Sequence, residues 1–239
     1  MHAVVTQVRD ETHDAKTFRF KPDTPMKFKP GQFVMIELQV PQPDGAVKKV
    51  KRAYSLSSSA ANSGEVETTV KVYEKGAFSP WLFKLKEGDS VELTGPYGLF
   101  VFEEHMSDNI VLIGAGSGVS PLLGMARYLA DRKSTVKATF IYSNKTPEDI
   151  MCLKDLVELE KKNHNFKCVH TITRPQESKL EWKGRVGRID SKLVTESAAV
   201  NDRTLYYLCG PPEMVKGTRE ILLNELKVPA QRIKVEIYD

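Results

Sequence analysis

The sequence predicts a two-domain α+β protein, with an antiparallel β-barrel followed by a doubly wound parallel α/β sheet. Short alternating or β-branched runs, separated by turn residues, fill residues 4–101 and are typical of antiparallel strands. From residue 109 onward, apolar strands alternate with amphipathic helices, which indicates a parallel sheet covered by helices on both faces. A chain of 239 residues is long enough for two cores, and we place the domains at 1–104 and 105–239.

The first domain is expected to contain six strands and one short helix. The strands are residues 4–10, 16–22, 32–40, 52–58, 65–73 and 89–95, and the helix is 79–85. The second domain is expected to alternate strands and helices, with a looser stretch after residue 174. Its strands are 110–114, 136–142, 166–174, 204–210 and 232–239, and its helices are 121–133, 147–163 and 211–227.

The composition excludes several classes of protein. A net charge of +4 and a pI near 8.8 make the chain mildly basic, well below the charge density of a nucleic-acid-binding module. No apolar run approaches the roughly 20 residues of a membrane span, so we expect a soluble, cytoplasmic protein. Three dispersed cysteines are too few for a disulfide framework, a structural zinc or an iron–sulfur pattern, so no metal is expected.

A glycine-rich turn at residues 114–118 joins an apolar run to a helix that Pro121 is expected to open. Its small side chains would let a phosphate approach the backbone, and the N–H groups at the helix start would face that phosphate. The turn departs from the dinucleotide-binding fingerprint, because Val119 stands where G-x-G-x-x-G has its third glycine. A tight strand-to-helix turn without a ligand therefore stays an alternative.

Two segments of the first domain also suit a phosphate-bearing ligand. Arg52, Tyr54 and Ser55 place a cation, an aromatic face and a hydroxyl close together, which suits a planar ring with a phosphate tail. Gly76 precedes a short helix that Ser79 is expected to cap, which gives a second possible anion site. Taken alone, the first segment is also typical of a strand edge, and the second of a capped helix that plugs a barrel end.

Cys209 ends an apolar strand of the second domain and is followed by Gly210 and Pro211. Ligands of open α/β sheets bind outside the carboxyl ends of the strands. We therefore expect Cys209 to face the same crevice as the glycine turn.

Taken in order, these segments resemble the ferredoxin-NADP reductase superfamily over nearly the whole chain. The resemblance is carried by PGQF at residue 30, RAYS at 52, GAFSPWL at 76, LKEGDSVELTGPYG at 85, GSGVSP at 116, CGPP at 209 and VEIYD at 235. It implies a flavin-binding barrel, a nicotinamide-nucleotide-binding sheet and the activity of a flavoprotein oxidoreductase.

The resemblance also implies roles for single residues in the barrel. Arg52 would pair with the flavin pyrophosphate, Tyr54 would flank the isoalloxazine ring, and Ser55 would hydrogen-bond near its N5 atom. Further contacts to the pyrophosphate would come from Gly76, Ala77, Phe78 and Ser79.

In the second domain, the resemblance implies that the glycine turn binds the nucleotide phosphates. The residues concerned are Gly116, Ser117, Gly118 and Pro121. Cys209, with Gly210 and Pro211 after it, would lie beside the nicotinamide C4 and flavin N5 atoms and orient the two for hydride transfer.

The end of the chain, VEIYD, is similar to the C-terminus of plastid-type members. In those proteins a carboxylate lies near the site and a final tyrosine stacks on the flavin, and here these would be Glu236 and Tyr238. With Ser55 and Cys209 they form the expected catalytic set. The chain departs from the pattern because Asp239 follows the tyrosine, and a plain terminal edge strand stays an alternative.

The resemblance implies FAD and a nicotinamide nucleotide as cofactor and co-substrate. FAD is preferred over FMN because the pyrophosphate segment at Gly76 is well formed. Arg174 resembles the Ser-Arg pair of NADPH-using members, whereas residues 143–149 resemble members that prefer NADH. Between the two nucleotides we favour NADPH.

We therefore expect an NAD(P)H-dependent flavoenzyme that passes electrons to a separate protein, with ferredoxin or flavodoxin as the expected acceptor. Lysines in residues 27–29 and 48–51 would attract an acidic partner. The alternatives are the reductase component of a multi-component oxygenase, a flavin-bearing electron-transfer subunit of a larger complex, and a non-enzymatic nucleotide-binding protein.

Overall fold

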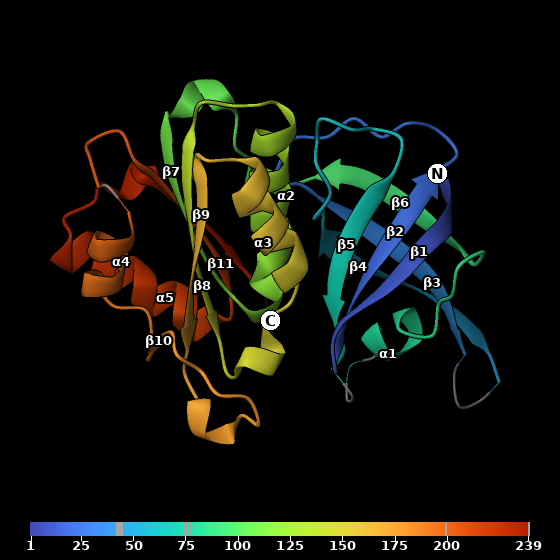
Figure 1. Cartoon of the computed structure of the whole chain (residues 1–239). Helices are drawn as coiled ribbons and strands as arrows, with labels where there is room; N and C mark the ends of the chain where they lie inside the picture. The colour runs from blue at the N-terminus through green and yellow to red at the C-terminus, as the bar shows by residue number, and fades with distance from the viewer. Residues whose placement is uncertain (42–44, 74–75, 77, 199, 239) are drawn as a thin grey trace.

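The computed structural model describes residues 1–41, 45–73, 76, 78–198 and 200–238, and it consists of two bodies side by side (Figure 1). The N-terminal body is a six-stranded antiparallel sheet in the order β4-β3-β6-β1-β2-β5. Its strands are β1 (His2–Thr12), β2 (Ala15–Pro22), β3 (Phe33–Pro41), β4 (Val47–Ser55), β5 (Val66–Lys71) and β6 (Ser90–Tyr97). The predicted number of strands in this domain is confirmed.

The N-terminal sheet closes on itself where β4 ends. Leu56 forms a bridge with Thr68 of β5, and the N–H of Ser57 donates to the carbonyl of Glu67 at 2.8 Å. These contacts join the two outermost strands of the order, so the sheet curls into the predicted barrel.

The interior of the barrel is apolar. Phe18 and Phe20 of β2 are fully buried there, and Leu82 of the short helix α1 (Ser79–Leu82) packs into the same core. Fully burying each such side chain contributes roughly 1.5–3 kcal/mol. The barrel therefore has a core of its own.

The C-terminal body is a parallel sheet of six strands in the order β10-β9-β8-β7-β11-β12. Its strands are β7 (Asn109–Ala115), β8 (Lys137–Asn144), β9 (Phe166–Ile172), β10 (Arg185–Val186), β11 (Leu205–Gly210) and β12 (Ile233–Ile237). Its helices are α2 (Val119–Asp131), α3 (Leu153–Lys162), α4 (Ser191–Ser197) and α5 (Pro212–Glu220), which continues as a π-helical turn, Ile221–Glu225.

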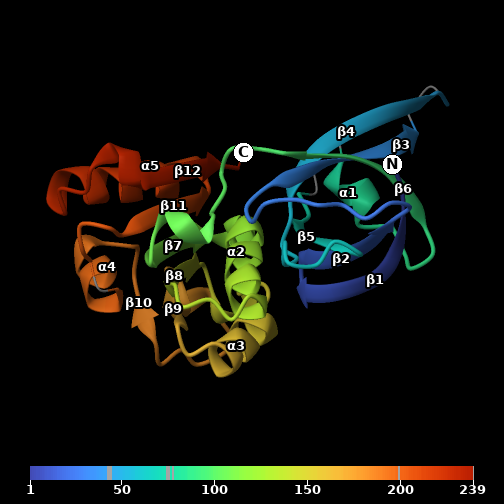
Figure 2. The same ribbon diagram turned by 90° about the horizontal axis from the view of Figure 1, so that it is seen from above.

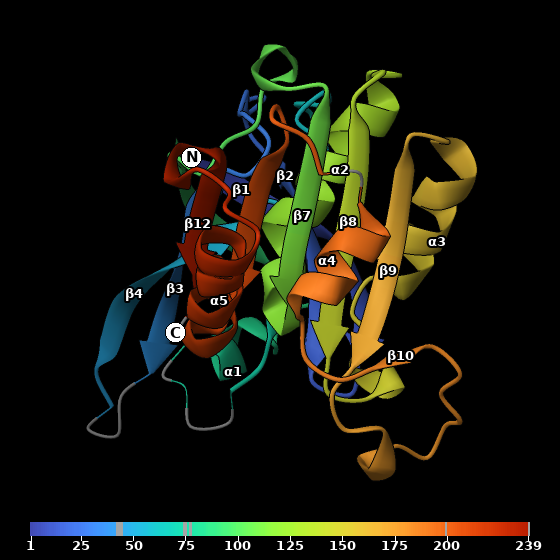
Figure 3. The same ribbon diagram turned by 90° about the vertical axis from the view of Figure 1, so that its left-hand side faces the viewer.

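Helices cover both faces of the parallel sheet, as predicted (Figure 3). α2 and α3 pack on one face, and α4 and α5 pack on the other. Because neighbouring residues of a strand point to opposite faces, Leu112 of β7 lies in the first core, whereas Val111 and Ile113 lie in the second. Among the described residues, none of the helices is long and apolar enough to cross a membrane.

The order of the parallel strands reverses between β7 and β11. The chain moves from β7 outward through β8 and β9, and then returns to β11 on the other side of β7. Such a switch point opens a crevice at the carboxyl ends of the two strands, where open α/β sheets bind their ligands. Gly116 and Cys209 lie at these two ends.

The two sheets are joined by residues 98–108, which run from β6 to β7 (Figure 2). The Tyr207 hydroxyl donates to the carbonyl of Val101 at 2.9 Å and ties this connection to β11. The domain boundary after residue 104 falls within the connection and stays a prediction.

The structure corrects two helix boundaries. α2 begins at Val119, so Pro121 stands at its third position rather than opening it. Proline is tolerated there because the N–H groups of the first helical turn have no acceptor within the helix. The expected helix 147–163 begins only at Leu153, because the backbone of Cys152 is left-handed, with φ 57°.

α4 and β10 lie in a stretch for which no element was expected. Asp190 caps α4, since its side chain accepts from the N–H of Leu193 at 2.7 Å.

Leu112→Ala should test the core beneath the glycine turn. Leu112 is fully buried, so we expect the free energy of unfolding to fall by about 2–5 kcal/mol in urea titrations. Leu180→Ala is the matched control, because Leu180 is 58% exposed and its loss should stay within about 0.5 kcal/mol. Equal effects of the two changes would contradict the described core.

Candidate active site

Four polar side chains meet where the barrel contacts the parallel sheet. Ser55 ends β4 in the barrel, whereas Cys209, Glu236 and Tyr238 come from the C-terminal body. The Tyr238 hydroxyl donates to the Oγ atom of Ser55 at 2.6 Å, and Ser55 donates to the Oε2 atom of Glu236 at 3.2 Å. The Sγ atom of Cys209 lies 4.0 Å from the same carboxylate oxygen. We call these four residues the Ser55 cluster; it brings together the expected catalytic set.

The sheet ladder fixes the part of the cluster that the C-terminal body supplies. β11 and β12 pair in parallel, with Cys209 opposite Glu236. Past the end of β12, the N–H of Tyr238 donates to the carbonyl of Gly210 at 3.1 Å. The final segment is therefore an edge strand that also carries two polar side chains into the cluster.

Ser55 is held from two sides. It pairs with Phe33 in the β3–β4 ladder, and its carbonyl accepts from the Oγ atom of Ser120 in α2 at 2.8 Å. Only 6% of Ser55 is exposed, so its hydroxyl has a fixed environment. Ser120 lies within the GSGVSP segment, but the sequence analysis gave it no role, because its partner is a backbone carbonyl of the barrel.

Burial controls the protonation of the Ser55 cluster. Burial raises the pKa of the Cys209 thiol well above its ordinary value, and the neighbouring Glu236 carboxylate raises it further. Burial also raises the pKa of Glu236 and, more strongly, the pKa of the Tyr238 hydroxyl. Cys209 is therefore a neutral thiol at neutral pH, which suits contact and orientation rather than nucleophilic attack.

The glycine turn lies next to Cys209. Gly116–Gly118 is a short 3₁₀ turn directly before α2, and Gly116 has a positive φ of 53°, which favours glycine. A Cβ at Gly118 would lie 2.1 Å from the carbonyl oxygen of Cys209, so only glycine allows this approach. The turn therefore leaves backbone N–H groups and the half-buried Ser117 at the switch point, where a phosphate can be bound.

Gly210 and Pro211 form the other wall of the crevice. Gly210 has a φ of 146°, and a Cβ there would lie 2.9 Å from the carbonyl oxygen of Ala115. Pro211 is the N-cap of α5, with an extended backbone. The two strand ends thus approach each other through backbone alone.

On the barrel side, aromatic rings lie near Ser55. Tyr54 is half-buried, and its ring centroid lies 5.9 Å from that of Phe78. Burial raises the pKa of the Tyr54 hydroxyl. Arg52 is exposed and donates to the carbonyl of Lys51 at 2.8 Å. No carboxylate in the described part of the chain forms an ion pair with its guanidinium.

The segment before α1 differs from the prediction in one respect. Ser79 does not cap the helix: it is the first helical residue, and its hydroxyl accepts from the N–H of Tyr73 at 3.1 Å. Phe78 is the N-cap and makes no side-chain cap bond. A Cβ at Gly76 would lie 2.9 Å from the carbonyl oxygen of Tyr73, so the turn is closed tightly around glycine. Ala77 lies outside the described residues.

Arg174 lies away from the Ser55 cluster, just past the end of β9. Its N–H donates to the carbonyl of Lys145 at 2.8 Å, which brings the ends of β8 and β9 together. Its side chain is half exposed and forms only a 3.5 Å surface ion pair with Glu177. Such a pair is weak, so the guanidinium is accessible to an anionic ligand.

Two family models match the chain, one on each body. The model described as an oxidoreductase FAD-binding domain matches residues 2–102, and that described as an oxidoreductase NAD-binding domain matches residues 112–220. Together they cover most of the barrel and most of the parallel sheet.

The chain is also similar to named proteins. It is 34% identical to the reductase component of propane 2-monooxygenase from Mycolicibacterium smegmatis, over 88% of this chain and 60% of that protein. It is 30% identical to NADH-cytochrome b5 reductase 1 from Dictyostelium discoideum, over 86% of this chain and 71% of that protein. The solved structure of a ferredoxin reductase in carbazole 1,9a-dioxygenase matches with a TM-score of 0.82 and 31% identity, over all of this chain and 69% of that one.

The relatives differ from this chain in length. The chain spans between 58% and 62% of three of the curated relatives that it matches, two oxygenase reductase components and a cytochrome b5 reductase. The matched part corresponds to the two bodies described above.

Glu236→Gln should change how stability depends on pH. The pKa of Glu236 is raised above its ordinary value near 4.5, so between these two values the folded protein binds more protons than the unfolded chain. The parent therefore loses stability as pH rises through that window and levels off above the folded pKa. The glutamine variant lacks this loss, which is about 1.4 kcal/mol for each pH unit that separates the two pKa values. When melting temperatures are measured across pH, that of the variant should rise relative to that of the parent above pH 4.5.

Glu225→Gln is the matched control, because Glu225 is exposed at the end of the π-helical turn. Its melting curve should stay parallel to that of the parent. Parallel curves for the Glu236 variant as well would show that the carboxyl is not perturbed by burial.

Proposed function

Because the chain belongs to the ferredoxin-NADP reductase family of FAD- and NAD-binding oxidoreductases, we propose that it takes a hydride from NAD(P)H and passes electrons to a protein acceptor. The observation that carries the proposal is the Ser55 cluster. It joins a side chain of the FAD-binding domain to side chains of the NAD-binding domain within hydrogen-bond distance. Hydride transfer between two bound ligands needs a site where residues of both domains hold the ligands in contact.

The described residues fit FAD. The exposed cation of Arg52 suits a pyrophosphate, and the rings of Tyr54 and Phe78 give an aromatic surface beside Ser55. The tight turn at Gly76 brings backbone close to that surface. Bound FAD would supply the conversion between two-electron and one-electron chemistry.

The Ser55 hydroxyl is the group that the chain offers to a flavin ring edge. Tyr238 donates to its Oγ atom, which directs the hydroxyl proton of Ser55 toward Oε2 of Glu236. In this chain of hydrogen bonds, the Ser55 hydroxyl holds the proton and the Glu236 carboxylate can accept it. The raised pKa of Glu236 makes proton uptake by that carboxyl easier.

Cys209 and Tyr238 act through position. Cys209 is fully buried and neutral at the end of β11, so it presents a small, polarizable surface to the nicotinamide ring. Tyr238 occupies the space beside Ser55. When the nicotinamide binds there, the Tyr238 side chain would either lie beside it or move away. Both residues exclude water from the reacting atoms.

For the nucleotide, the turn Gly116–Gly118 would bind the phosphates at the start of α2. Arg174, which is accessible past the end of β9, supports a 2'-phosphate and therefore NADPH. The name of the NADH-cytochrome b5 reductase relatives supports NADH. We propose NADPH on the chemistry of Arg174, and the experiment below compares the two nucleotides directly.

The proposed acceptor is a ferredoxin, a flavodoxin or an oxygenase component. The relatives named as oxygenase reductase components favour the last, which makes a role as such a component the second candidate function. The basic clusters of the barrel give weaker support. Glu37 pairs with both Lys49 and Lys51 at 3.0 Å, and Glu103 pairs with Lys29 at 2.8 Å, so part of the positive charge is neutralised.

Anaerobic stopped-flow mixing of the FAD-loaded protein with NADH and with NADPH tests the function. We expect bleaching of the flavin absorbance by at least one nucleotide. Cys209→Ala should keep FAD bound and slow the bleaching by about 10- to 100-fold, because orientation is lost. Cys168→Ala is the matched control, since Cys168 lies on β9 away from the cluster. A parent that neither nucleotide bleaches would contradict the proposed function, and an unaltered rate would remove Cys209 from the site.

Arg52→Ala should weaken the binding of FAD. Losing a charge-assisted hydrogen bond costs about 1.5–3 kcal/mol. This corresponds to roughly a 10-fold or greater rise in Kd, measured by titrating flavin fluorescence. Lys48→Ala, which removes an exposed cation from the same strand, should leave the Kd unchanged. Equal Kd values for the parent and the Arg52 variant would refute the assignment.

A further inference from the structure

One face of α2 rests on barrel residues 55–58, the segment that begins with Ser55. Three residues of this face stand four and three positions apart, which is the spacing of one side of a helix. They are Ser120, Gly124 and Arg127, and we call them the α2 clamp. Since α2 starts directly after the glycine turn, the clamp and the turn belong to one helical element.

Each member of the clamp reaches a backbone carbonyl of the barrel segment. Ser120 donates through Oγ to the carbonyl of Ser55 at 2.8 Å, and Arg127 donates through Nη1 to that of Ser57 at 2.8 Å. A Cβ at Gly124 would lie 2.6 Å from another carbonyl oxygen of the segment, so only glycine permits the approach. Contacts to the backbone fix the path of the chain, whatever rotamers its side chains adopt.

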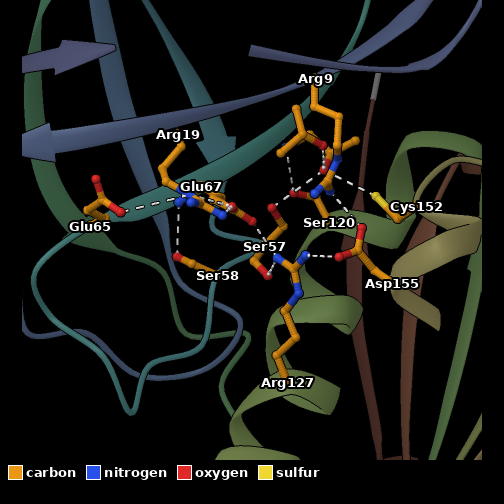
Figure 4. Close-up of polar contacts among 12 residues, drawn as sticks. Arg9, Arg19, Ser57, Ser58, Glu65, Glu67, Ser120, Arg127, Cys152 and Asp155 are labelled. Atoms are coloured by element: carbon orange, nitrogen blue, oxygen red, sulfur yellow. Dashed lines mark hydrogen bonds and ion pairs between the residues drawn. The ribbon is translucent and has the colours of Figure 1, made fainter. Parts of the chain in front are cut away.

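Arg127 also joins the two bodies by charge (Figure 4). Its guanidinium, only 16% exposed, pairs with Glu67 of β5 and, through Nη2, with the Oδ1 atom of Asp155 in α3 at 2.6 Å. Arg9 of β1 binds the other oxygen of Asp155 at 2.6 Å. Arg19, Glu11 and Glu65 complete the network, which contains three arginines and four carboxylates.

This network defines geometry more than it adds stability. Burying charges costs solvation free energy that their attraction only partly returns, whereas removing one partner leaves an unpaired buried charge. Fixed charges also allow few registers between two surfaces. A cavity of about 370 Å3 opens over the network, and its lining is largely charged, so the seam is polar. A polar seam of this kind resists sliding of the two bodies.

We propose that the α2 clamp, to which Arg127 adds the charged contacts, holds the glycine turn at a fixed distance from Ser55 and thereby sets the rate of hydride transfer. The inference rests on the proposed function. The turn would bind the nucleotide that donates the hydride, and the segment that starts at Ser55 would border the flavin that accepts it. A displacement of about 1 Å at such a site is enough to slow a reaction about 100-fold. Arg127 is therefore a positioning residue.

The kinetic test uses a charge-balanced variant, Arg127→Met with Glu67→Gln, so that no buried charge of this pair is left alone. We expect the FAD content to be unchanged and the limiting rate of flavin reduction to fall by about 10-fold or more. The Kd for the nucleotide should change less than about threefold, because the turn itself is intact. Ser120→Ala removes the hydrogen bond to the carbonyl of Ser55 and a longer one from the N–H of Thr69, but no charge, and should lower the same rate by a smaller factor.

The matched control is Arg132→Met. Arg132 lies just after α2, is 60% exposed and pairs only at the surface with Glu104. It makes the same Arg→Met replacement as the test variant, but at an exposed position, and its rate should equal that of the parent. If the charge-balanced variant does not fold, Ser120→Ala carries the kinetic test alone.

A distance measurement tests the clamp without enzymatic activity. Spin labels at Lys86→Cys in the barrel and Lys192→Cys in α4 report the separation of the two bodies, with Cys168→Ser in every protein. The FAD-loaded parent and the Arg132 control should give one narrow distance distribution, and the charge-balanced variant a broader or shifted one. An unchanged distribution, or an unchanged rate, would overturn the inference. A parent that nucleotides do not reduce would contradict the proposed function, while the distance distribution would still decide whether the clamp holds the bodies.

Discussion

The contact between α2 and the barrel segment 55–58 is the constraint on which the site depends. Ser55 belongs to one body, and Cys209 and Glu236 belong to the other, 154 and 181 positions later in the chain. Within each body, hydrogen bonds of the sheet place these residues, but only packing between the bodies brings them within reach of one another. Arg127, buried between Glu67 of the barrel and Asp155 of α3, is a charged link in that packing. The catalytic geometry is thus a property of the interface rather than of either domain.

The C-terminal body contributes its part through the topology of the parallel sheet. The reversal of strand order between β7 and β11 opens a crevice at their carboxyl ends, and glycines at 118 and 210 let the backbones approach there. The pairing of β12 with β11 then carries Glu236 to the same place as Cys209. Burial raises the pKa of Cys209, Glu236 and Tyr238 in the resulting cluster. A buried site from which water is largely excluded suits the orientation of two flat ligands.

Local patterns were enough to predict the fold, because hydrophobic period and turn residues are local properties. The Ser55 cluster was predictable from motifs that lie next to each strand end, at RAYS, CGPP and VEIYD. The α2 clamp was not, since the partners of Ser120 and Arg127 are backbone carbonyls far along the chain, and no local pattern reveals such contacts. The helix-capping role expected for Ser79 was wrong for a similar reason: its hydroxyl bonds to Tyr73, a contact made by the turn of the chain and not by helix capping. α4 went unseen because its seven residues are too few for a clear period.

The central claim is that the ligand-binding site lies at the interface of the two bodies, around Ser55. The most direct test is a crystal structure of the protein loaded with FAD. The fold and the Ser55 cluster predict electron density for the flavin ring beside Tyr54 and Ser55, with the pyrophosphate near Arg52 and the Gly76 turn. Flavin density elsewhere on the barrel, or an ordered FAD that makes no contact with Ser55, would contradict the claim.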